Sequence, residues 1–117
     1  MNSEHMVIIQ NIVKKIVQAI SNNNYEKITE ITNNQRVSSK VIKSEIEEYG
    51  RTICVPNQDV FKNIDIVYVE DSNPNQYSVR FDLYTEEEGL SDLTLEMTFF
   101  ITESNHVTTE IDGIHVL

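Results

Sequence analysis

The spacing of hydrophobic residues along this chain changes once, near residue 51, from a period of 3.6 to a period of 2. A chain that keeps its helices in one half and its strands in the other favours an α+β fold, because parallel α/β folds need the two kinds of element to alternate. The strands expected after residue 51 follow one another through short links. We therefore expect an antiparallel sheet.

Three amphipathic helices are predicted in the first half, over about residues 6–20, 25–32 and 39–49. Gly50 follows the third one, where a helix commonly ends in a left-handed residue. The first helix shows the clearest spacing, and its apolar stripe consists of Ile9, Ile12, Val13, Ile16, Val17 and Ile20.

Five strands are predicted, over about residues 51–55, 64–70, 76–85, 91–102 and 107–116. Alternating apolar and polar residues predict that one face of the sheet is covered. The strand at 64–70 is apolar on both sides, which leaves open which face this is. We expect a single domain over residues 1–117, with the helices packed on one face of a curved sheet. This two-layer architecture is that of cystatin-like and nuclear-transport-factor-like folds.

The chain has 9 Lys and Arg against 19 Asp and Glu, a formal net charge of −10. This charge repels phosphate backbones, so we expect no direct nucleic-acid partner and favour a basic protein. The alternative is that the charge only maintains solubility. With Cys54 as the single cysteine and no positive flank of a signal peptide, we expect a cytoplasmic location. The first helix is too polar to span a membrane.

Catalytic and metal-binding motifs are weak, and we expect no catalytic residue, metal or cofactor. The histidines His5, His106 and His115 are far apart, and we expect His5 in a frayed terminus. Asp112 and His115 are three residues apart in one strand, which predicts that they point to opposite faces. Cys54 is expected to act as a small hydrophobic residue.

Carboxylates on neighbouring strands offer one catalytic alternative. Two of them brought close together could share a proton, and one could then act as an acid. The other interpretation is a solvated sheet face. The candidates are Asp82, Asp92, Glu96, Glu110 and Asp112.

An acidic hairpin between the third and fourth strands is the most informative feature of the sequence. A tyrosine among carboxylates is typical of a surface that captures a basic protein. The alternative is that the charges guard the neighbouring Phe81, Phe99 and Phe100 against edge-to-edge aggregation. The residues predicted to bind a partner are Asp82, Tyr84, Glu86, Glu87, Glu88 and Asp92.

Three stretches of the chain resemble a group of small, uncharacterised bacterial domains with the same strand-rich second half. They are EEYGRT at 47–52, the segment from YSV at 77–79 through DLYTEEEG at 82–89 to SDLTL at 91–95, and IDGIHVL at 111–117. The likeness spans about residues 7–117 and implies a fold more than an activity. In size and charge the chain also resembles immunity proteins of bacterial toxin systems.

The leading functional hypothesis is an immunity-type protein that neutralises a cognate toxin through its acidic surface. The toxin would be a basic nuclease domain, because nucleases present positive clefts. One alternative is a small-ligand-binding or enzymatic domain of the nuclear-transport-factor-like kind, which needs a pocket between helices and sheet. Another is a homodimer formed through exposed apolar residues such as Val67, Val69 and Phe100.

Overall fold

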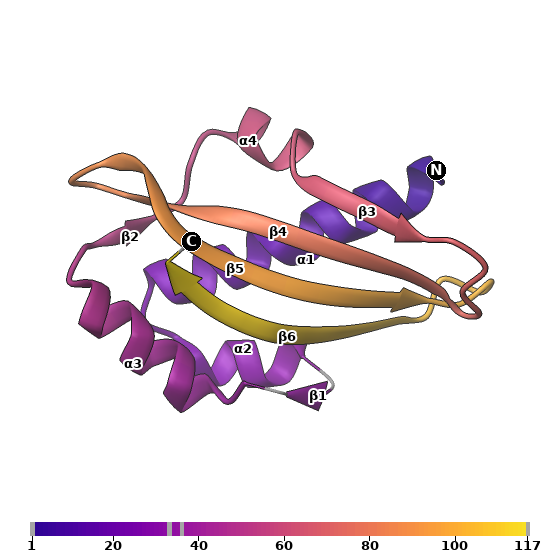
Figure 1. Cartoon of the computed structure of the whole chain (residues 1–117), viewed down its shortest axis with the longest axis horizontal. Helices are drawn as coiled ribbons and strands as arrows, with labels where there is room; N and C mark the ends of the chain where they lie inside the picture. The colour runs from indigo at the N-terminus through magenta and orange to yellow at the C-terminus, as the bar shows by residue number, and fades with distance from the viewer. Residues whose placement is uncertain (1, 33, 36, 117) are drawn as a thin grey trace.

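The computed structural model describes residues 2–32, 34–35 and 37–116. The helices lie almost entirely before the strands, as the change of period predicts (Figure 1). The elements in chain order are α1 (Ser3–Ser21), α2 (Tyr25–Ile31), β1 (Asn34–Gln35), α3 (Ser39–Tyr49), β2 (Ile53–Cys54), α4 (Gln58–Lys62), β3 (Asp65–Val69), β4 (Asn75–Thr85), β5 (Gly89–Ile101) and β6 (Val107–Val116).

The three long strands β4, β5 and β6 form an antiparallel meander at the centre of an open, curved sheet (Figure 1). The strands β3 and β2 pair with different parts of β4, residues 76–80 and 84–85 respectively. At the other edge, β1 pairs with β6 in parallel. The predicted α+β architecture, with N-terminal helices on one face of an antiparallel sheet, is confirmed.

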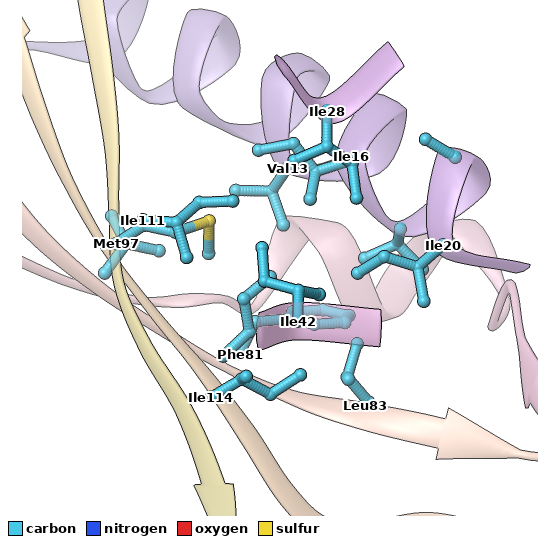
Figure 2. Packing of buried hydrophobic residues seen from close by; sticks show 14 of the residues in the cluster. Val13, Ile16, Ile20, Ile28, Ile42, Phe81, Leu83, Met97, Ile111 and Ile114 are labelled. Carbon is cyan, nitrogen blue, oxygen red and sulfur yellow. The ribbon is translucent and has the colours of Figure 1, made fainter. Parts of the chain in front are cut away.

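One face of the sheet packs against the helices and forms the core. Figure 2 shows side chains of α1, α2 and α3 meeting those of the long strands, among them Ile16, Ile42 and Met97. All three are fully buried. The polar residues that alternate with the buried ones on β4 lie on the opposite face, which the helices leave open. On β3 the exposed Val67 and Val69 belong to this open face, which settles what the sequence left open.

Two short elements, α4 and β1, were not predicted from the sequence. The strand expected over 51–55 is present but shorter, as Ile53–Cys54. The segment after it forms α4, where the Asn57 side chain accepts a hydrogen bond from the backbone N–H of Asp59. The strand β1 has two residues and pairs with a segment more than seventy residues away. Elements this short carry no periodicity, because they span about one turn or one pleat.

The prediction of a frayed terminus at His5 is wrong. Asn2 caps α1 by accepting hydrogen bonds from the backbone N–H groups of Glu4 and His5, so the helix starts three residues earlier than expected. The His5 ring is 2% exposed, and its Nδ1 lies 2.7 Å from the hydroxyl of Tyr77 on β4. The first turn of α1 is therefore tied to the sheet.

The prediction that Asp112 and His115 face opposite sides of the sheet is also wrong. Opposite Glu96 and Met97 of β5, the strand β6 presents Gly113 and Ile111, so that Asp112 is an extra residue in a β-bulge. The bulge shifts the alternation by one residue. Ile111 and Ile114 are therefore both buried, and Asp112 and His115 bond to residues of the open face.

Candidate functional site

The acidic hairpin joins β4 to β5 at the end of the sheet where α3 and β2 also lie (Figure 1). Its base is closed by pairing of Tyr84 with Leu90 and of Thr85 with Gly89. Gly89 has φ 75°, a left-handed conformation that glycine adopts without the cost of a Cβ. Glu86, Glu87 and Glu88 are therefore held together in one exposed turn.

Two of these three carboxylates are ordered by the segment that leads into β2. The Glu87 carboxylate accepts hydrogen bonds from both the backbone N–H and the hydroxyl of Thr52, each at 2.8 Å. These bonds favour the ionised form and lower the pKa of Glu87. The Glu88 carboxylate accepts a bond from the Tyr49 hydroxyl at 3.0 Å, and Nε of Arg51 lies 3.9 Å away. Because most of the hydrogen-bond donors that order the turn are neutral groups, they do not cancel the negative charge of its carboxylates.

The other predicted partner-binding residues lie beside this turn. Asp82 and Tyr84 belong to the open face of β4, where Asp82 is exposed and accepts a hydrogen bond from Thr94 at 2.6 Å. The ring of Tyr84 is half-buried. Asp92 is exposed on β5, in the irregular stretch between the pairs Asp82–Thr94 and Tyr84–Leu90. The six predicted residues thus lie on the hairpin and on the strands next to it.

The C-terminal half of α3 contributes acidic residues that the sequence reasoning missed. Glu45, Glu47 and Glu48 lie just before Tyr49, whose hydrogen bond to Glu88 joins α3 to the hairpin. The signal was present in the sequence: glutamates near a helix C-terminus oppose the helix dipole at a cost of about 0.3–1 kcal/mol each. No basic residue lies in the last turn.

We call the surface formed by residues 43–51 and 86–92 the acidic end. These two segments carry seven carboxylates and two cations, Lys43 and Arg51. The carboxylates of the acidic end also act on neighbouring groups, in addition to burial. Burial raises the pKa of the Cys54 thiol, with further contributions from Glu86 and Glu87. Burial, and then the charge of Glu47, raises the pKa of the Tyr25 hydroxyl.

Two of the carboxylates proposed for acid catalysis, Glu96 and Asp112, contact other kinds of side chain, and a third, Glu110, is only 9% exposed. Glu96 bonds to the His115 ring, with Oε1 and Nε2 2.6 Å apart, and Asp112 accepts a hydrogen bond from Thr98 at 2.5 Å. A histidine or a hydroxyl, and not a second carboxylate, is the partner in each of these contacts. Within residues 2–32, 34–35 and 37–116, no group of three or more His, Cys, Asp or Glu side chains is placed to hold a metal ion.

Two pockets lie beside the C-terminal half of α3. One of about 280 Å³ lies among the ends of α1 and α3 and the start of α2, and its lining includes Tyr25, Glu47 and Arg51. A second, of about 270 Å³, lies between α3 and the ends of β5 and β6. The core between α1 and the sheet is filled by fully buried side chains such as Val13 and Val79.

No described helix is long and apolar enough to cross a membrane. No curated protein and no solved structure matches the chain significantly. The model of one protein family matches residues 17–117, which include α2, α3, the whole sheet and the acidic end. Leu117, the last residue of the IDGIHVL stretch, lies outside the described residues. The chain belongs to the family described as Domain of unknown function (DUF7668).

Proposed function

We propose that this domain binds a basic protein through its acidic end, and that it acts as an immunity-type protein whose partner is a cognate bacterial toxin. The observation that carries the proposal is the meeting of two acidic segments that are about forty residues apart in the sequence, with the Tyr49–Glu88 hydrogen bond between them. Glu45 and Glu48 oppose the helix dipole and have no cation at ion-pair distance among the described residues, whereas Glu47 lies 3.9 Å from Nζ of Lys43 on the same helix. Partner recognition gives these charges a purpose that helix stability does not.

Besides its charge, the fixed conformation of the hairpin favours binding. Because Thr52 and Tyr49 already hold Glu87 and Glu88, less conformational entropy is lost when a partner docks. A nuclease toxin fits this surface chemically, since its cleft is positive where it receives phosphate. The carboxylates would occupy that cleft in place of the nucleic acid and so block the active site. Charge attraction over several ångströms would also speed the encounter.

The test uses the purified chain and the toxin domain encoded beside its gene, or a panel of basic nuclease domains where no such neighbour exists. We expect loss of nuclease activity at equimolar ratio. The association rate should fall by about tenfold or more from low to high salt, because the attraction is screened. The immunity proposal is wrong if none of these nucleases is bound or inhibited.

A matched pair of charge reversals separates the acidic end from the net charge of the chain. Glu86→Lys changes an exposed carboxylate of the hairpin, whereas Glu103→Lys makes the same change in the exposed turn between β5 and β6, at the opposite end of the sheet (Figure 1). We expect Glu86→Lys to slow association several-fold more than Glu103→Lys does. Equal effects would show that only the overall charge matters.

A further inference from the structure

The acidic end contains a pocket whose lining suits one kind of side chain. The pocket has a volume of about 270 Å³, and its lining combines carboxylates, an aromatic ring and aliphatic groups: Glu45, Glu48, Tyr49, Leu93 and Val116. Leu93 is 1% exposed and Val116 is 58% exposed, so an aliphatic surface is still open to solvent beside two carboxylates. The five described lining residues include no lysine or arginine.

We propose that this pocket receives a lysine or arginine side chain of the protein partner, an inference that rests on the proposed function. Both side chains have an aliphatic stem and a cationic head. The stem would cover the exposed side chain of Val116, and the head would meet Glu45 and Glu48 in charge-assisted hydrogen bonds. The ring of Tyr49 adds a surface on which a cation is attracted to π electrons.

Tyr49 also fixes the pocket in place before a partner arrives. Its hydroxyl donates to both carboxylate oxygens of Glu88, at 3.0 and 3.3 Å, and this holds the ring between the pocket and the hairpin. A neutral or acidic side chain of similar length would fill the same space without balancing the charges of Glu45 and Glu48. The pocket therefore selects for positive charge at one position of the partner.

Capped amino acids test the pocket on the full chain without any knowledge of the toxin. N-acetyl-arginine amide and N-acetyl-lysine amide are titrated into ¹⁵N-labelled protein, with the capped citrulline and norleucine compounds as uncharged counterparts. We expect saturable shifts of the amide signals around the pocket for the two cations, and at least about fivefold weaker binding of the uncharged compounds. Equal binding of charged and uncharged compounds, or shifts that map to another surface, would overturn the proposal.

Three variants assign the binding to the pocket lining. Glu45→Gln combined with Glu48→Gln should weaken binding of the capped cations by about fivefold or more, while Glu103→Gln should leave it unchanged. Tyr49→Phe keeps the ring and loses the bond to Glu88, so it should retain most of the binding. If the double variant binds the capped cations as tightly as the unchanged chain does, the pocket is not their site.

The two proposals can fail separately. If the chain binds the capped cations but no nuclease, the pocket proposal stands and the immunity proposal is wrong. If the Glu45→Gln, Glu48→Gln variant binds and inhibits a toxin as well as the unchanged chain does, the immunity proposal stands and the pocket has no part in it.

Discussion

The covered face of the sheet and the acidic end are built on opposite principles. On the covered face, side chains such as Val79, Met97 and Phe99 are completely buried and stabilise the fold through apolar contact. At the acidic end, carboxylates gather where they repel one another and oppose the dipole of α3. The first region explains why the chain folds. The second is explained better by something outside the chain, and the two should respond differently to mutation.

The largest expected effect is on the covered face. Phe99→Ala removes a fully buried ring from β5 and should lower the free energy of unfolding by about 3–5 kcal/mol, because a cavity replaces the lost contacts. Urea denaturation followed by circular dichroism measures this change. Glu86→Ala, in the hairpin, should change stability by less than about 0.5 kcal/mol. If the two variants lost a similar amount of unfolding free energy, the two regions would not differ in how they contribute to stability.

A buried polar contact should have an intermediate effect. Tyr77→Phe removes the hydroxyl that bonds to His5 and leaves the ring nitrogen of a 2% exposed histidine without that partner. We expect a loss of about 1–3 kcal/mol, again from denaturant unfolding. Tyr84→Phe is the matched control, since this ring lies half-buried on the open face. An equally large loss of stability in Tyr84→Phe would mean that the His5–Tyr77 hydrogen bond does not stabilise the fold more than an ordinary tyrosine hydroxyl does.

The covered face was also the part of the molecule that the sequence predicted best. Periodicity located α1, α3 and the three long strands to within a few residues, because each has several buried positions that follow the period of a helix or a strand. It missed the bulge at Asp112, since one extra residue moves the His115 side chain to the other face of the sheet and leaves no mark in the sequence pattern. It also missed the burial of His5, which depends on Tyr77, 72 residues away.

The acidic end was predicted only in part. The run Glu86–Glu88 is contiguous, so the sequence alone indicated a charged hairpin. The contribution of α3 depends on a contact between Tyr49 and Glu88, 39 residues apart, which no local pattern contains. The roles within the hairpin were also hidden. Glu87 and Glu88 bond to the segment before β2, whereas no such bond is seen for the Glu86 carboxylate among the described residues.

The hydrogen bonds that the Glu87 carboxylate accepts from Thr52 should make a small, pH-dependent contribution to stability. The bonds from Thr52 lower the pKa of Glu87 below its ordinary value of 4.5 in the folded chain. The contribution is therefore fully present above that ordinary value, and it is lost as the pH falls through the lower pKa of the folded state. Thr52→Val removes the hydroxyl donor and should raise the pKa of Glu87 toward 4.5, as measured by NMR titration of its side-chain carboxyl. An unchanged pKa would mean that the bond to the hydroxyl is not formed in solution.

The smallest expected effect uses Cys54 to sense the potential of the acidic end. Burial and the charges of Glu86 and Glu87 raise the pKa of this thiol, so little of the reactive thiolate is present at neutral pH. Glu86→Gln combined with Glu87→Gln should therefore speed alkylation by iodoacetamide by about twofold, whereas Glu103→Gln should not. Added salt should reduce the difference between the double variant and the unchanged chain, because it screens charge and leaves burial unaltered. A difference that persists at high salt would mean that the double substitution opened the hairpin and exposed Cys54, and the acidic end would then be a structural cover and not a source of long-range attraction.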